Sequence, residues 1–117
     1  MRVVVTGATG NVGTSLLAAL EHEHGVEEIV AIARRPLRRT FPRSIFVAAN
    51  IVTAELTELM RGADAVVHLA WLIQPGHDES VTHAVNVTGS ERVFRAAAQA
   101  GVCLLYTSDA ADDLTRV

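Results

Sequence analysis

The stretch that decides the fold is Val3-Val4-Val5-Thr6-Gly7-Ala8-Thr9-Gly10-Asn11-Val12-Gly13. It begins with a run of β-branched residues, continues with three glycines spaced three apart, and leads into residues that are apolar at helical spacing. This order predicts a strand, a tight turn and a helix, which is the arrangement of a dinucleotide-binding βαβ unit.

The three glycines have separate expected roles in that unit. Gly7 permits a sharp turn, because a side chain penalises a positive φ angle. Gly10 lets a pyrophosphate approach the backbone and the N-terminus of the helix, while Gly13 lets the helix lie close to the strand. A turn with a purely structural role is the alternative. The cofactor contacts expected from this stretch are Thr6, Gly7, Thr9, Gly10, Asn11, Val12 and Gly13.

The composition limits the size of the fold and the class of partner. The chain has 117 residues, half of them hydrophobic, which suffices for the core of one domain but is short for a complete doubly wound sheet. Its net charge of −3 gives no reason to expect nucleic acid or a membrane surface as a partner. No apolar run is long enough to span a bilayer, and the first strand begins without a basic leader, so we expect a cytoplasmic location. The single cysteine, Cys103, excludes an internal disulfide and a cysteine-cluster metal site, and we expect no bound metal.

Strand and helix signals keep alternating after the first unit. Apolar spacing predicts a helix from Asn11 to about His24, with Gly25 as its C-cap. The first expected strand is Arg2–Thr6, and the expected later strands are Glu28–Ala33, Ser44–Ala49, Asp64–Ala70 and one that begins at Val102. The expected later helices are Ala54–Arg61, ended by Gly62, and Glu79–Ala100, ended by Gly101. This pattern predicts an α/β fold, a Rossmann-like doubly wound parallel sheet that is truncated after about the fourth or fifth strand.

The residues after the second expected strand bear on the type of cofactor. NAD-preferring sites place a carboxylate there, which accepts from the ribose 2′-hydroxyl. This chain has Arg34 and Arg35 instead, and a guanidinium would pair with a 2′-phosphate. We therefore expect NADP as the preferred cofactor, with NAD as the alternative. The neighbouring arginines, for which a solvated basic loop is the favoured interpretation, are Arg38, Arg39 and Arg43.

Three further residues are candidates for cofactor contacts because of their place in the chain. Asn50 and the adjacent Ile51 follow the third strand, where an adenine edge would arrive, and an amide offers both a donor and an acceptor. A turn role for Asn50 is nearly as well supported. Trp71 follows the fourth strand, where it would either line a pocket or cover the edge of the sheet.

Three segments in this order resemble motifs of the extended short-chain dehydrogenase/reductases, the NAD(P)-dependent epimerase/dehydratase group. Thr6–Gly13 resembles the TGxxGxxG signature, and Asn86–Ser90 resembles the Asn-Val-x-Gly-Thr helix motif. Asp64–Ala70 resembles a strand motif that usually ends His-Leu-Ala-Ala, with Trp71 in place of the last alanine. The resemblance covers Met1 to about Val102.

The resemblance implies further site residues and a type of parent protein. His68, Leu69 and Ala70 would line the nicotinamide side of the cofactor, and Asn86 would brace the active site. Arg34 stands near the acid that the family usually has, and Asn50 stands where the family usually has aspartate. The implied parent is an oxidoreductase that uses NAD(P) on a sugar nucleotide or a similar hydroxyl substrate, with a homodimer as one option for its assembly.

Catalysis in this family relies on a Tyr-x-x-x-Lys pair that this chain does not have. Tyr106 is the one tyrosine, Ala110 stands four residues later, and the sequence contains no lysine. Ser108 imitates the family's serine after the fifth strand but lacks this base. We therefore expect no catalytic residue and no turnover from these 117 residues. A non-catalytic NADP-sensing module is the alternative function.

The last residues have a resemblance of a different kind. Cys103–Asp112 resembles the translation of a transposase adapter used in sequencing libraries, and Asp113–Val117 fits its continuation. The expected division is therefore an NAD(P)-binding Rossmann part at residues 1–102 and a non-native tail at residues 103–117. A genuine fifth strand is the alternative.

Overall fold

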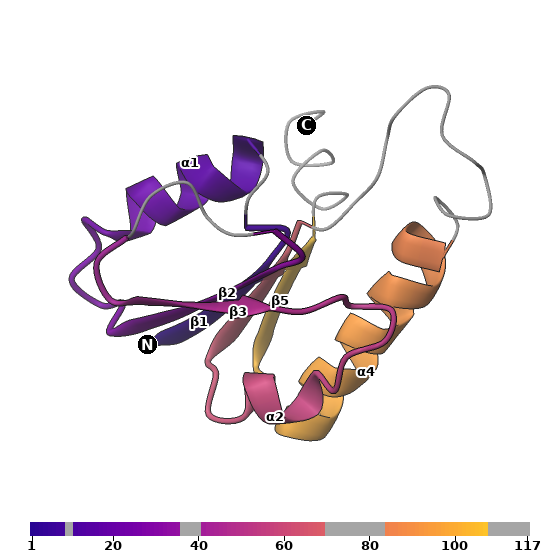
Figure 1. Cartoon of the computed structure of the whole chain (residues 1–117). Helices are drawn as coiled ribbons and strands as arrows, with labels where there is room; N and C mark the ends of the chain where they lie inside the picture. The colour runs from indigo at the N-terminus through magenta and orange to yellow at the C-terminus, as the bar shows by residue number, and fades with distance from the viewer. Residues whose placement is uncertain (9–10, 36–40, 70–83, 108–117) are drawn as a thin grey trace, which may run out of the picture.

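The computed structural model describes residues 1–8, 11–35, 41–69 and 84–107. They form a five-stranded sheet with the strand order β3-β2-β1-β4-β5, in which every neighbouring pair is parallel (Figure 1). The strands are β1 (Arg2–Thr6), β2 (Glu28–Ala33), β3 (Ser44–Ala48), β4 (Ala65–His68) and β5 (Leu104–Thr107). The strand order reverses direction between β1 and β4, which makes this pair the topological switch point of the sheet.

Helices cover both faces of the sheet, as a doubly wound fold requires (Figure 1). The helical segments are α1 (Asn11–Leu20), α2 (Thr57–Met60), the π-helix η1 (Ala84–Gly89) and α4 (Ser90–Ala100). Helix α1 lies on one face, and α2 and α4 lie on the other. No helix in the described ranges is long and apolar enough to cross a bilayer.

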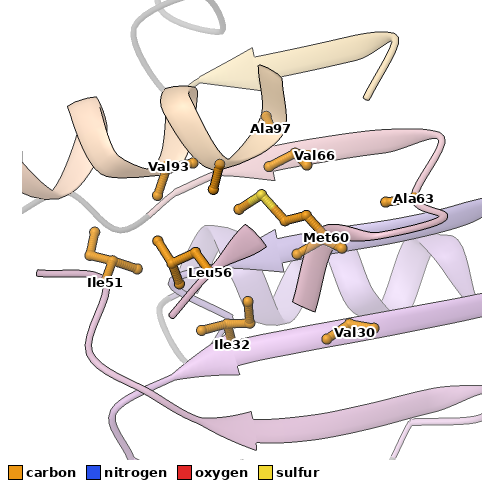
Figure 2. Packing of buried hydrophobic residues seen from close by; sticks show 11 residues of the cluster. Val30, Ile32, Ile51, Leu56, Met60, Ala63, Val66, Val93 and Ala97 are labelled. Carbon is orange, nitrogen blue, oxygen red and sulfur yellow. The ribbon is translucent and has the colours of Figure 1, made fainter. Parts of the chain in front are cut away.

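Strand β1 is buried on both faces because successive side chains point to opposite sides. Val3 and Val5 pack with Leu17 of α1. Val4 packs on the other face with Val93 of α4. Figure 2 shows this second cluster, in which Val30, Ile32 and Val66 of the sheet lie beneath α2 and α4.

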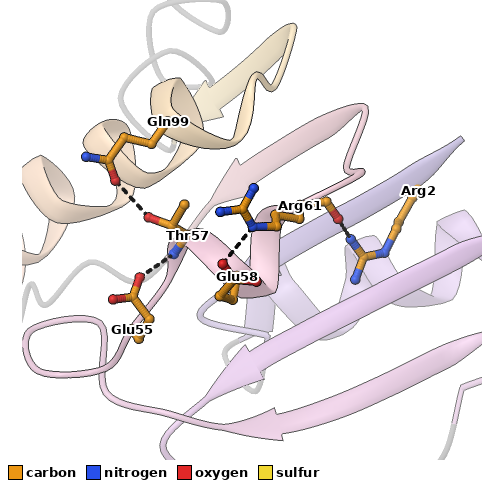
Figure 3. A network of polar contacts seen from close by, with 6 residues as sticks. All are labelled: Arg2, Glu55, Thr57, Glu58, Arg61 and Gln99. Atoms are coloured by element: carbon orange, nitrogen blue, oxygen red, sulfur yellow. Dashed lines mark hydrogen bonds and ion pairs between the residues drawn. The ribbon is translucent and has the colours of Figure 1, made fainter.

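Polar contacts fix the short helix α2 to its surroundings (Figure 3). Thr57 Oγ1 donates to Gln99 Oε1 of α4 at 2.9 Å, and Thr57 N donates to Glu55 Oε1 at 3.1 Å. At the other end of α2, the carbonyl of Arg61 accepts from the guanidinium of Arg2. Strand β1 and helix α4 therefore both hold α2 in place.

Helix α1 ends earlier than the sequence predicts, at Leu20 and not near His24, so Gly25 is not its C-cap. The reason is a tertiary contact. Arg43 Nη2 donates to the carbonyl of Glu21 at 2.5 Å, and Arg43 Nη1 donates to the carbonyl of Val26 at 2.6 Å. The guanidinium thus satisfies carbonyls in the turn after α1 and gives Arg43 a structural role that the solvated-loop interpretation did not include.

Other boundaries also differ from the prediction. Helix α2 has only the four residues Thr57–Met60 where a helix over Ala54–Arg61 was expected, because Thr57 N donates to Glu55 Oε1 before the helix and Arg61 after it is extended. The expected strand Asp64–Ala70 pairs with β1 only from Ala65 to His68. Within the expected helix Glu79–Ala100, the described part is divided into η1 and α4, and Gly101 caps α4 with φ 75°.

Strand β5 pairs in parallel with β4, from Ala65 opposite Leu104 to His68 opposite Thr107. It is two residues later than the expected start at Val102. Three of its side chains remain largely exposed: Leu104 (44%), Leu105 (40%) and Tyr106 (49%).

Candidate functional site

The candidate site lies where the parallel strands end, since their carboxyl ends meet at one edge of the sheet. The turn at Gly7 and Ala8 follows β1, Arg34 and Arg35 follow β2, and Asn50 comes shortly after β3. Leu69 follows β4, on the other side of the switch point. The fold therefore places segments far apart in the sequence at the edge where open α/β sheets bind ligands.

At Gly7 and Gly13, the two described glycines of the motif, the structure has the features that the glycine spacing predicts. Gly7 adopts φ 70°, which favours glycine. A Cβ on Gly13 would lie 2.4 Å from the carbonyl oxygen of Gly7 and 2.8 Å from Cα of Ala8, so no side chain fits there. Ala8 N donates to the carbonyl of Ile32 at 3.3 Å and ties the turn to β2. The N-terminus of α1 therefore lies against the turn, where its N–H groups favour an anion.

The hydroxyl of Thr6, predicted as a cofactor contact, is part of a buried polar chain. Thr6 Oγ1 lies 2.6 Å from His68 Nδ1, and His68 Nε2 lies 2.8 Å from Ser90 Oγ. Thr6 and His68 are 0% and 2% exposed. These hydrogen bonds join the end of β1, the end of β4 and the first residue of α4.

The same threonine also fixes the residue that follows β4. Leu69 N donates to the carbonyl of Thr6 at 3.0 Å and to its hydroxyl at 3.2 Å. The rings of His68 and Phe94 form a T-shaped pair, with centroids 6.0 Å apart and an interplanar angle of 83°. Leu69, a predicted contact, is thus held at the switch point by its backbone.

Sequence reasoning did not find the part played by Ser90, nor the internal role of His68. One signal was available, because His68 is the single polar residue in the apolar run from Ala65 to Ala70. A buried polar side chain needs hydrogen-bond partners. The hydrogen-bond partners of His68 depend on the order of the strands in the sheet. That order cannot be read from the residues next to His68 in the sequence.

The loop after β3 shows that Asn50 makes a turn. Asn50 Oδ1 accepts from Val52 N at 2.9 Å, and the carbonyl of Asn50 accepts from Ala54 N at 2.8 Å. The donor on Val52 requires an acceptor, which identifies the amide atom facing it as the oxygen. The Nδ2 group is then the part of the Asn50 side chain that can meet a ligand. Ile51 is 6% exposed and packs in the core, so a ligand contact would come from its backbone.

Arg34 and Arg35 are exposed and follow β2 directly. The carbonyl of Ala33 accepts from Ala49 N at 3.0 Å, so the two strand ends stay paired up to the point where the arginines leave the sheet. Neither guanidinium forms an ion pair with a described residue.

The remaining predicted contacts have no described side chains. Thr9, Gly10, Ala70 and Trp71 lie outside the described residues. Asn11 and Val12 begin α1, and Asn86 lies within η1, but the structure describes only their place in these helices. Within the described ranges, no group of three or more His, Cys, Asp or Glu could hold a metal ion.

Comparisons with known proteins agree with this geometry. The model of the NAD dependent epimerase/dehydratase family matches residues 3–111. An uncharacterized protein of Mycobacterium tuberculosis is 39% identical over 112 residues, which cover 92% of this chain and 12% of that protein. The L-arabinose 1-dehydrogenase (NAD(P)(+)) of Haloferax volcanii is 36% identical over 101 residues, covering 86% of this chain and 37% of the enzyme.

Solved structures give the same picture. The complex of MoeE5 with UDP-glucuronic acid and NAD matches with a TM-score of 0.77 and 31% identity, over 92% of this chain and 36% of that one. The uronate dehydrogenase from Agrobacterium tumefaciens matches with a TM-score of 0.73 and 25% identity, over 86% of this chain and 37% of that one. The chain therefore spans 12% to 37% of the length of these four proteins.

Proposed function

Because the chain belongs to the NAD dependent epimerase/dehydratase family, we propose that it is the NAD(P)-binding part of a sugar-nucleotide epimerase/dehydratase-type oxidoreductase. The observation that carries this proposal is the contact between Gly13 and the Gly7–Ala8 turn, with no space for a Cβ. It brings the N-terminus of α1 to the switch point of the sheet, where a pyrophosphate is stabilised by backbone N–H groups and the helix dipole.

The described residues fit the parts of a dinucleotide in order along the sheet edge. The Gly7 turn and the start of α1 would hold the pyrophosphate, and the Asn50 loop would face the adenine. Leu69, on the far side of β1, would face the nicotinamide, with Ala70, Trp71 and Asn86 as further contacts. When bound, the dinucleotide supplies hydride transfer. The residues of this chain bind and orient it.

NADP is the proposed preference, on the strength of Arg34 and Arg35. Both side chains are exposed at the end of β2, where the adenosine ribose of a dinucleotide lies in this fold. The solved relative MoeE5 holds NAD, and the Haloferax enzyme is named for both cofactors. We therefore propose that Arg34 and Arg35 bind the 2′-phosphate and give NADP the higher affinity at a site whose fold also binds NAD in relatives.

The substrate proposal concerns the longer protein of which such a domain is a part. MoeE5 has been solved with UDP-glucuronic acid and with UDP-glucose, which supports a sugar nucleotide. Since the 117 residues contain no Tyr-x-x-x-Lys pair, we propose that this chain alone has no turnover. A cytoplasmic location and a homodimeric parent belong to the same proposal.

The division at residue 102 is a proposal about the origin of the last residues. The resemblance of residues 103–117 to a translated adapter supports it, as does the exposure of Leu104, Leu105 and Tyr106. The pairing of β5 with β4 and the family match to residue 111 favour the alternative, a genuine strand. Sequencing the source DNA past the codon for Val102 decides between them. A different frame that leads to a Tyr-x-x-x-Lys pair supports the proposal, and an encoded tail followed by a stop favours the NADP-sensing module.

The binding proposal is tested by titrating the chain with NADPH and NADH and following their fluorescence. Gly10→Val is expected to abolish binding of both, because its side chain would keep the pyrophosphate from the backbone. The matched control is Gly25→Val, since a Cβ at Gly25 meets nothing within 4 Å. Equal affinity of the two variants would contradict the assignment of the site.

A further inference from the structure

Arg92 lies in the first turn of α4, and its side chain contacts the loop after β3. Its Nη1 donates to the carbonyl of Ile51 at 2.7 Å, and its Nη2 donates to the carbonyl of Ala54 at 2.7 Å. The side chain is partly buried in both contacts. One planar guanidinium thus holds two carbonyls three residues apart, which a lysine ammonium cannot reproduce with the same geometry.

The carbonyl that Arg92 holds belongs to a peptide unit that is also fixed at its other end. The Ile51 carbonyl and the Val52 N–H are parts of the same planar group. Val52 N donates to Asn50 Oδ1 at 2.9 Å while the carbonyl accepts from Arg92. The second contact fixes two successive peptide units, because Ala54 N donates to the carbonyl of Asn50 on one side of the Ala54 Cα and the Ala54 carbonyl accepts from Arg92 on the other. Asn50 and Arg92 together therefore set the shape of the loop.

Ionic hydrogen bonds of this kind are stronger than neutral ones, and they are stronger again where water is partly excluded. The loop also has a hydrophobic anchor, because Ile51 packs in the same cluster as Val93, the residue after Arg92 (Figure 2). Helix α4 contacts the sheet edge at a second point, through Ser90 and His68. Ser90 and Arg92, two positions apart on α4, therefore hold the end of β4 on one side of the switch point and the loop after β3 on the other.

We infer that Arg92 is a positioning residue for the adenine end of the dinucleotide, an inference that rests on the proposed function. Arg92 acts through Asn50 and Ile51: it holds the backbone that presents the Asn50 amide at the strand edge. Removing the guanidinium frees two carbonyls and loosens the loop, while the Gly7 turn and Leu69 keep their contacts.

The test compares NADH with its adenine-free half, NMNH, both followed by fluorescence on the full chain. Arg92→Met is expected to weaken NADH about tenfold, since hydrogen bonds to charged groups contribute about this much. The affinity for NMNH should stay within about twofold. Arg95→Met is the matched control, because Arg95 lies on the same helix, is exposed and pairs with Glu91 at 3.3 Å. It should leave both affinities unchanged.

The outcomes separate the inference from the proposed function. If the unmodified chain binds neither NADH nor NADPH, the proposed function fails. If it binds NADH and the Arg92→Met and Arg95→Met variants bind it equally, the inference is overturned. An equal loss for NADH and NMNH also overturns it, because that result indicates general destabilisation. Should Arg92→Met not fold, Arg92→Lys replaces it, with the same selective loss expected and faster hydrogen exchange at Val52 N and Ala54 N.

Discussion

Thr6 Oγ1 lies 2.6 Å from His68 Nδ1, and this contact joins the last residue of β1 to the last residue of β4. The two strands are neighbours at the point where the strand order reverses. The edge proposed to hold the dinucleotide is therefore braced from inside the protein by side chains, in addition to the backbone pairing of the strands.

Replacing Thr6 with valine removes this brace while keeping the shape of the side chain. The change leaves buried polar groups of His68 and Leu69 with fewer partners, so the free energy of unfolding should fall by about 1–3 kcal/mol. Urea unfolding measures it. Thr53→Val is the control, because Thr53 is exposed. Equal stability of the two variants would show that the hydroxyl of Thr6 contributes nothing.

Adding one methyl group at Gly13 should be far more damaging than its size indicates. The new Cβ would lie 2.4 Å from the Gly7 carbonyl oxygen, so either α1 or the turn must move. We expect Gly13→Ala to lower the unfolding free energy by at least about 1–3 kcal/mol, as overpacking of a tight site does. Thermal unfolding followed by circular dichroism checks this. Gly25→Ala, in open space, should melt like the unmodified chain.

The proposed role of the two exposed arginines predicts a selective change in cofactor affinity. Arg34→Asp combined with Arg35→Ala removes both partners of a 2′-phosphate and adds a charge that repels it. NADPH affinity should fall by about a hundredfold or more, while NADH affinity changes little or improves. Fluorescence titration measures both. If the affinities for NADPH and NADH fell equally, Arg34 and Arg35 would not bind the 2′-phosphate.

Asn50→Asp should change which base the loop prefers. Oδ1 can still accept from Val52 N, but the amide donor becomes a carboxylate acceptor. Adenine carries an amino donor where hypoxanthine carries a carbonyl acceptor. The ratio of affinities for NADH and reduced nicotinamide hypoxanthine dinucleotide should therefore shift toward NADH by about threefold to tenfold. Thr53→Asp adds the same charge nearby, and if it shifts the ratio equally the effect is only electrostatic.

Strong local signals explain what could be predicted from the sequence. Strands β1 and β2 were found with their observed bounds because each contains a continuous apolar run, as is typical of parallel strands buried on both faces. The turn between β1 and α1 was predictable because the positive φ of Gly7 and the space at Gly13 both demand glycine. These features depend on neighbours in the sequence.

The parts that could not be predicted depend on contacts between distant residues. Helix α1 ends where it does in a structure that brings Arg43 to the carbonyls of Glu21 and Val26. The roles of His68 and Arg92 require knowing that α4 packs between the end of β4 and the loop after β3. No local sequence pattern specifies these contacts, because they follow from the order of the strands in the sheet.

The parallel pairing of every strand also has a consequence for how the chain folds. None of the strands in the described part of the chain is antiparallel to a neighbour, so none of these pairs can form as a hairpin. Val3 pairs with Ala65, and Ala65 with Leu104, only across long intervening segments. The entropy of closing these loops is lost before the core repays it, which makes folding slow. Meanwhile β5, with its apolar side chains exposed, can pair with the same strand of another molecule. The yield on refolding should therefore fall as the protein concentration rises.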